Sequence, residues 1–364
     1  MEYIIGTIYG NAIGDALGLA TEFMTEEEVS KKYGKIENFE YSMIIQDYHR
    51  KTWKRGDWTD DTDQMLLVLD TLVESKSADQ RLFSKKLSNW LDYGFKECED
   101  TKGHGAGNTT SIWWGDKFIF SDPEHASLRV FVYNPFCPCN SESNGAVMRT
   151  SIIGLFNYNN TDDVINNTIK ICTVTHSSPK AVLSCLFITI LITKIIKREI
   201  DNIFEEVLII IKNSFMNYCE KFHDKIENLL NLCQNNYDNM SNVIINNINQ
   251  YYKKYDYNEI INEFKTYIDV KNLDELKLNE KIGYTFKPVG CACYGLKEAF
   301  NEHNNFEKII CKIIQKGGDA DTNCAVAGSV LGAYYGINKI PNKFKDNLYY
   351  KDFLEKKITK FLNI

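Results

Sequence analysis

The sequence has no excess of positive charge and no long hydrophobic run. Its 364 residues carry a formal net charge of -7, which argues against a dedicated binder of nucleic acid or of anionic membranes. A small soluble ligand suits this charge better. The longest apolar run, near residues 181–193, is shorter than the ~20 residues that a bilayer-spanning helix needs. That run therefore predicts a buried helix.

The N-terminal segment has no basic lead-in. It also carries Asn11 and Asp15 within its apolar residues, so it predicts neither a signal peptide nor a membrane anchor. The chain has 11 cysteines, an odd number, and it is too long for a small secreted disulfide scaffold. We therefore expect reduced, buried thiols and a cytoplasmic monomer without nucleic-acid or membrane partners.

Helical periodicity recurs along the chain, and no strand pattern competes with it. We expect an all-α fold in which residues 1–364 form a single domain. Residues 197–280, rich in Asn, Ile, Lys and Tyr, predict a peripheral helical elaboration without chemistry. Residues 24–55 are polar and predict an irregular segment, whereas residues 143–156 are expected to enter a helix.

Glycine recurs every fourth residue in two segments. One segment has glycines at 6, 10, 14 and 18, and the other has them at 328, 332 and 336. On a helix this interval places the glycines on one face, where a second helix can approach closely. Each glycine costs a helix ~1 kcal/mol relative to alanine. The pattern therefore predicts that these two helices pack together and position a common site.

Two acidic stretches precede expected helices, one an apolar run from residue 64 and the other the glycine-rich segment after residue 323. GDWTDDTD spans residues 56–63 and GGDADTN spans residues 317–323. Helix capping explains one or two acidic residues in a loop, but clustered carboxylates repel one another unless a cation stabilises them. All the donors are carboxylate or hydroxyl oxygens, which suit Mg²⁺, Mn²⁺ or Ca²⁺. We interpret the two stretches as halves of one metal site.

GGDADTN does not match an EF-hand loop. With Asp319 as the first position, Cys324 stands where the loop needs glycine and Val330 stands where it needs glutamate. The phosphatase motif DxDxT also fails, because Thr322 comes one residue too early and the context is helical.

Residues 102–110, KGHGAGNTT, form a glycine-rich loop with Asn108 to Thr110 available to cap a helix. Such a loop can hold an anion through its backbone N–H groups. It is neither a dinucleotide-binding motif nor a P-loop, which excludes those two folds. His176 precedes an expected helix that starts near Pro179, and it is open to either a structural or a ligand-binding role.

The ordered set of motifs resembles the ADP-ribosylglycohydrolase family. These motifs are GxxxGDALG at 10–18, WTDDT at 58–62, NGAVMR at 144–149, TH at 175–176, and GGDADT with AGSVLGAYYG within 317–336. The resemblance implies a compact orthogonal helical bundle around two Mg²⁺ ions, with Mn²⁺ as a substitute. It also implies release of ADP-ribose from a modified protein or a small conjugate.

Site residues follow from the resemblance position by position. The residues similar to the family's metal ligands are Thr59, Asp60, Asp61, Asp319, Asp321 and Thr322. Asp60, Asp61, Asp321 and Glu22 resemble its catalytic acids, and those similar to its ligand-binding positions are Gly103, Gly105, Gly107, Ser141, Asn144 and His176. Two positions depart from the pattern: Ser143 replaces a glycine and Ala320 replaces a threonine.

Two alternatives stay open. One is a hydrolase of a free ADP-ribose conjugate or nucleotide sugar, and the other is an ADP-ribose-binding or structural member without catalysis. Loss of acidic ligands would favour the second alternative, and no acidic ligand is lost here. The linkage that is cleaved does not follow from these motifs.

Overall fold

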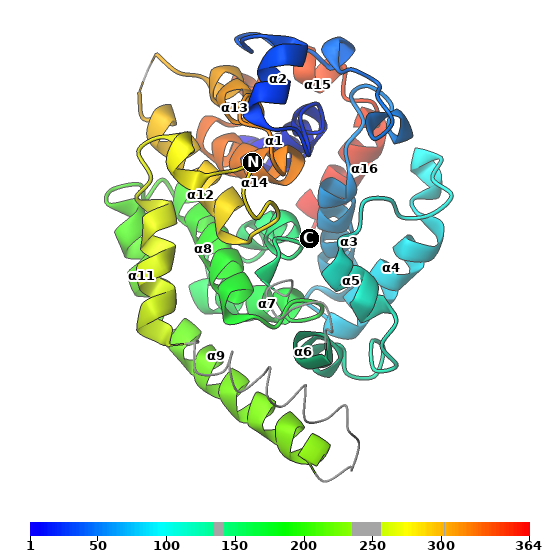
Figure 1. Ribbon diagram of the computed structural model, residues 1–364, viewed down its shortest axis with the longest axis vertical. Helices are drawn as coiled ribbons and strands as arrows, with labels where there is room; N and C mark the ends of the chain where they lie inside the picture. The colour runs from blue at the N-terminus through cyan, green and yellow to red at the C-terminus, as the bar shows by residue number, and fades with distance from the viewer. Residues whose placement is uncertain (134–141, 235–255, 302) are drawn as a thin grey trace.

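The computed structural model describes residues 1–133, 142–234, 256–301 and 303–364, and in these ranges the chain is helical (Figure 1). Their one pairing of β type is an isolated bridge between Ser143 and Tyr284. The all-α prediction is confirmed. The helices are α1 Glu2–Gly18, α2 Glu26–Tyr33, α3 Asp60–Ser75, α4 Gln80–Tyr93, α5 Asn108–Trp114, α6 Pro123–Tyr133, α7 Thr161–Cys172, α8 Pro179–Ile196, α9 Ile203–Gln234, α11 Tyr257–Ile268, α12 Phe286–Ala299, α13 Phe306–Ile314, α14 Ala320–Tyr335, α15 Asn342–Asp346 and α16 Lys351–Leu362.

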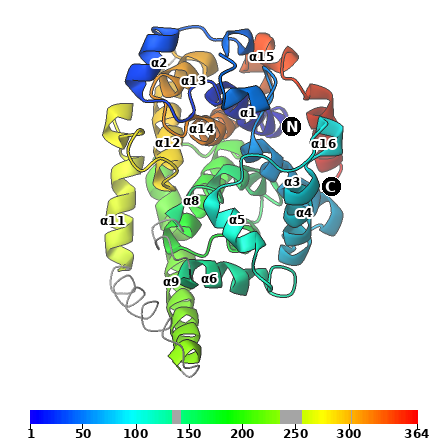
Figure 2. The same ribbon diagram turned by 45° about the vertical axis from the view of Figure 1, so that its right-hand side comes forward.

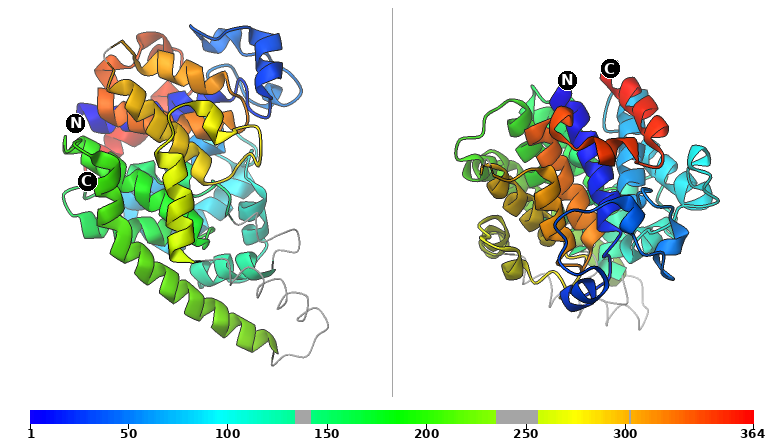
Figure 3. Two further views of the ribbon diagram at one scale, coloured as in Figure 1. Left: turned by 60° about the vertical axis from the view of Figure 1, so that its left-hand side comes forward. Right: turned by 90° about the horizontal axis from the view of Figure 1, so that it is seen from above.

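Helices α1 and α14 pack side by side through their glycines (Figure 3). A Cβ atom added to Gly10 would lie 2.0 Å from the carbonyl oxygen of Gly328, and one added to Gly332 would lie 1.9 Å from that of Gly6. The predicted glycine contact is therefore confirmed. The two helices run antiparallel, which brings the C-terminal end of α1 to the N-terminal end of α14.

The core surrounds α8, against which α7 and α9 pack. Among the described residues this is the one helix long and apolar enough to cross a membrane, and 89% of it is buried inside the protein. A core helix passes the same test, and the prediction of a buried helix at 181–193 agrees with this position.

Helix α9 packs against α8 along part of its length and then extends away from the body (Figure 2). Val207, Ile211, Phe215 and Phe222 are buried on one face, at the spacing of an amphipathic helix. Helix α11 adds Phe264, whose ring lies 5.2 Å from that of Phe187 in α8. Residues 197–280 thus contribute to the core where they are described.

Residues 24–55 contain a helix that the sequence did not predict. In α2, Thr25 and Glu28 form a reciprocal capping box, and acidic and basic side chains lie at its N- and C-terminal ends respectively. Local capping and charge stabilise this helix. Since Val29 is its one buried residue, the apolar periodicity that reveals other helices is missing.

Residues 143–156 do not enter an α-helix. They form two short 3-10 turns, Val147–Arg149 and Ser151–Leu155, and every residue of both turns is buried. The segment passes between α3 and α8 and directs the Arg149 side chain into the interior. Apolar composition was mistaken there for helical periodicity.

The C-terminal segment folds back onto the body. Its buried apolar residues include Phe344, Leu348, Phe353, Leu354, Ile358 and Phe361. Helix α16 lies against α3, where Lys357 pairs with Asp70.

Candidate metal centre and ligand site

The two acidic stretches meet where α3 and α14 begin. Thr59 is the N-cap residue of α3, and Asp319 is that of α14. The hydroxyl of Thr322 donates a hydrogen bond of 3.2 Å to Oδ2 of Asp61, and that of Thr59 lies 3.4 Å from the same oxygen. Residues about 260 positions apart in the chain therefore share one carboxylate.

Asp15, on the last turns of α1, fixes the start of α3. Its buried carboxylate accepts hydrogen bonds from the backbone N–H and hydroxyl groups of both Thr59 and Thr62, at 2.6 to 3.1 Å. These four donors satisfy the carboxylate. Asp15 thus positions the acidic loop.

Glu22, Asp319 and Asp321 form a second part of the same centre. One carboxylate oxygen from each of them lies within 4.8 Å of the others. Glu22 follows α1, so the close α1–α14 packing brings it to the GGDADTN loop. The centre is therefore assembled from the C-terminal end of α1 and the N-terminal ends of α3 and α14.

The carboxylates of this centre repel one another. Burial raises the pKa of Asp60, Asp61 and Asp321 well above the usual range, and the charges of neighbouring carboxylates raise it further. Partial burial and the charge of Glu22 raise the pKa of Asp319 to about 6. Oδ1 of Asp61 and Oδ1 of Asp321 are buried without a hydrogen-bond partner.

These observations fit a cation. Buried polar atoms without partners are costly, and a bound divalent ion would supply the missing partner and lower the pKa values. The donors are all oxygens, which suits a hard cation. Asp60, Asp61, Asp319, Asp321, Thr59 and Thr322 could hold it, with Glu22 at its edge.

The glycine-rich loop lies against Asp60. Gly105 has a φ of +96°, and a Cβ atom there would lie 2.4 Å from Oδ1 of Asp60, so both conformation and space require glycine. Gly103 packs on Trp90, whereas Gly107 faces open space. The expected side-chain cap is absent, because the N-cap residue of α5 is Gly107.

Asn144 and His176 occupy a neighbouring wall of the site. Asn144 donates a hydrogen bond of 2.6 Å to Oδ2 of Asp319. Nε2 of the buried His176 lies 2.9 Å from the hydroxyl of Ser143, which lies 3.1 Å from that of Thr109. Ser143, which departs from the family pattern, therefore joins His176 to the glycine-rich loop. Ser141 lies outside the described residues.

A buried hydrogen-bond chain connects His176 to Asp60. Gln64 donates to Asp60 at 2.8 Å, and Arg149 donates to Gln64 at 2.9 Å and to Thr175 at 2.7 Å. The hydroxyl of Thr175 lies 2.7 Å from Nδ1 of His176. Sequence reasoning missed Gln64, Arg149 and Thr175 as members of the site, although Arg149 and Thr175 lie within the motifs that carry the resemblance.

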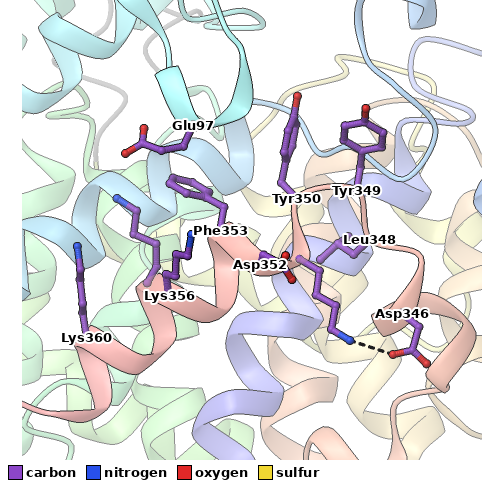
Figure 4. Close-up of a pocket in the computed structure, with 11 residues that line it drawn as sticks. Glu97, Asp346, Leu348, Tyr349, Tyr350, Asp352, Phe353, Lys356 and Lys360 are labelled. Carbon is purple, nitrogen blue, oxygen red and sulfur yellow. Dashed lines mark hydrogen bonds and ion pairs between the residues drawn. The ribbon is translucent and has the colours of Figure 1, made fainter.

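A pocket at the described surface lies away from these residues. It has a volume of about 570 Å³ and lies over α16, between Glu97 and the aromatic side chains of Tyr349, Tyr350 and Phe353 (Figure 4). None of the predicted site residues lines it. What marks the acidic centre as a candidate site is its cluster of buried carboxylates with unpartnered oxygen atoms.

Comparison with known proteins gives the same family as the motifs. A family model described as ADP-ribosylglycohydrolase matches residues 1–363. An ADP-ribosylarginine hydrolase of Serratia proteamaculans is 21% identical, over 94% of this chain and 74% of its own. An ADP-ribosyl-(dinitrogen reductase) glycohydrolase of Rhodospirillum rubrum is 22% identical, over 94% and 89%.

A solved structure titled ADP-ribosylglycohydrolase-related protein complex shares the fold. Its TM-score is 0.63 at 18% identity, and the match covers 100% of this chain and 97% of that one. Because the family model spans nearly the whole chain, this protein belongs to the ADP-ribosylglycohydrolase family and is a hydrolase of that type.

Proposed function

We propose that this protein is a divalent-cation-dependent hydrolase that releases ADP-ribose from a modified protein side chain. The observation that carries the proposal is the meeting of two acidic loops around Asp61 and Asp321, each of which has a buried carboxylate oxygen without a partner. The names of the Serratia and Rhodospirillum relatives support ADP-ribose conjugates as the substrate class. A reducing, cytoplasmic setting is part of the proposal.

Two Mg²⁺ ions, with Mn²⁺ as a substitute, are the cofactors that we propose. When bound, such ions supply Lewis-acid chemistry by polarising oxygen atoms and lowering the pKa of water. Asp60, Asp61, Asp319, Asp321, Thr59 and Thr322 would hold them.

The carboxylates of the chain have two tasks in the proposed hydrolysis. A water oxygen forms a bond to the anomeric carbon of the ribose, and the bond from that carbon to the attached group breaks. Asp60, Asp61 or Asp321 accepts the proton that the water loses. Glu22, at the edge of the centre, donates a proton to the departing group.

The neutral wall would bind the rest of the ligand. His176 is buried, and its burial and the charge of Arg149 lower its pKa to about 3. It is therefore an uncharged imidazole at neutral pH, held by Thr175 and Ser143. With both nitrogens engaged, it would orient Ser143 toward the ADP-ribose, while Asn144 and the glycine-rich loop offer neutral hydrogen-bonding groups.

The test is release of ADP-ribose from arginine-linked, serine-linked and O-acetyl conjugates, with Mg²⁺ and with a chelator. We expect release from at least one conjugate with Mg²⁺ and none with the chelator. Tight binding of ADP-ribose without release from any conjugate would instead identify a binding protein.

A further inference from the structure

His49 holds the carboxylate of Glu22. Nε2 of His49 and Oε2 of Glu22 lie 2.6 Å apart, and 33% of the His49 side chain and 8% of that of Glu22 are exposed. His49 comes from the polar segment 24–55, in which the sequence indicated no function. This separation is that of a hydrogen bond between the imidazole and the carboxyl group.

Arg50 fixes the main chain on both sides of this contact. Its guanidinium is buried and donates 2.8 Å hydrogen bonds from Nε to the carbonyl oxygens of Leu19 and Ala20. It also donates to the carbonyl oxygen of Glu22 and, at 2.7 Å, to Asp47. Arg50 thus satisfies carbonyl groups left free at the end of α1 and places the adjacent His49 over Glu22.

Two aromatic rings lie beside the imidazole. The ring centroid of Phe23 lies 5.1 Å from that of His49, and the ring centroid of Trp53 lies 5.4 Å from it. Phe23 has a φ of +61°, a strained conformation for a bulky residue. Its backbone N–H donates a 2.7 Å bond to the carbonyl oxygen of Gly318. This bond ties the Glu22 loop to the residue before Asp319.

We propose that His49 is a positioning residue, which keeps Glu22 beside Asp319 and Asp321 and acts on cation binding and turnover through Glu22 alone. The carboxylate belongs to Glu22, which lies just beyond the end of α1. Held by His49, it keeps an oxygen within 4.8 Å of the other two acids. The kinetic part of this inference rests on the proposed function, and the binding part does not.

A double-mutant cycle tests the inference. The cycle compares the wild-type protein with His49→Ala, Glu22→Ala and the double variant. Calorimetry measures Mn²⁺ affinity, and kcat is measured on a conjugate from which the wild-type protein releases ADP-ribose. Loss of a residue that orients a metal-site group typically costs 10–100-fold in metal affinity or activity. We expect a loss of about 10-fold for His49→Ala in the wild-type background and less than about twofold in the Glu22→Ala background.

Two further variants separate the hydrogen bond from packing. His49→Gln keeps an N–H donor near the position of Nε2 and should stay within about threefold of wild type. Trp53→Leu removes a ring contact but keeps His49 and should leave Mn²⁺ affinity within about twofold.

Equal losses from His49→Ala in both backgrounds, no loss in either, or a failure of His49→Gln to restore affinity would overturn the proposal. If the wild-type protein released ADP-ribose from no conjugate, the proposed function would fail, and the Mn²⁺ cycle would still decide the role of His49.

Discussion

The acidic side of the site, formed by Asp61, Asp319 and Asp321, and the neutral side, formed around His176, both lie at loops that lead into helices. On the neutral side, Ser143 and Thr175 satisfy both imidazole nitrogens. On the acidic side, two buried carboxylate oxygens lack a partner. The difference teaches that the imidazole of the neutral side finds its partners within the protein, whereas the acidic side has oxygen atoms free to hold a cation.

Removal of one acidic ligand should produce the largest effect. Asp321→Asn keeps the side-chain volume but removes a charge, so turnover should fall by about 10³-fold or more and the Mg²⁺-induced rise in Tm should disappear. The metal-free variant should be more stable than the metal-free wild type at pH 8, because one repelling carboxylate is gone.

Thermal unfolding with and without Mg²⁺ measures this effect, and Asp352→Asn, on the exposed part of α16, is the control. Wild-type turnover and an unchanged Mg²⁺ effect in Asp321→Asn would contradict the assignment.

The packing beneath both sides can be broken at Gly328. A Cβ atom there would lie 2.1 Å from the carbonyl oxygen of Gly10, so Gly328→Ala should cost at least ~3 kcal/mol in unfolding free energy by forcing α1 and α14 apart. Gly295 lies within α12, where a Cβ atom would meet only Ile309 and Leu331 side chains, at 3.4 Å or more. Gly295→Ala should therefore be neutral or stabilise by up to ~1 kcal/mol. Urea unfolding measures the unfolding free energy of both variants. Equal values for the two variants would contradict the close packing of α1 against α14.

The sequence allowed much of this architecture to be predicted, because its signals were periodic or local. The glycine interval of four predicted the α1–α14 contact, and clustered aspartates predicted the acidic side. The contacts of Glu22 with His49, of Asp60 with Gln64 and of Gln64 with Arg149 were not predictable in the same way. Such contacts depend on tertiary placement of single polar residues, and His49 lies in a segment where helix α2 itself carried no apolar signal.

The pH dependence of stability should also distinguish the acidic side from the neutral side. Burial raises the pKa of Asp15 to about 6, as partial burial and Glu22 do for Asp319. A carboxyl group with a raised folded-state pKa favours folding when protonated, so metal-free stability should fall as the pH rises from about 4 through about 6.

The rise in Tm caused by Mg²⁺ should accordingly be larger at pH 8 than at pH 5, because protons compete with the ion at low pH. His176 acts in the opposite sense over this interval: its pKa is lowered from 6.5 to about 3, so its contribution to metal-free stability rises with pH. That contribution is the same with and without Mg²⁺ and leaves the difference between the two curves unchanged. Thermal unfolding across pH measures both curves, and a Mg²⁺ effect that is equal at the two pH values would count against the acidic side as the ion's site.

The smallest effect should come from the neutral side. Ser143→Gly restores the glycine of the family pattern and removes the hydroxyl that contacts His176 and Thr109. A neutral hydrogen bond contributes about 0.5–1.5 kcal/mol, so KM should rise by only a few-fold while the Mg²⁺ effect on Tm stays unchanged. Steady-state kinetics measure the change, and loss of the Mg²⁺ effect would show that the two sides are not independent.

The central claim is that the WTDDT and GGDADTN loops together hold one divalent-cation centre. Calorimetric titration of Mn²⁺ into the wild-type protein, Asp61→Asn and Asp321→Asn tests it most directly, because these residues come from different loops. The account predicts binding to the wild type and a loss of at least about 10-fold in affinity in each variant. Wild-type affinity in either variant would contradict it.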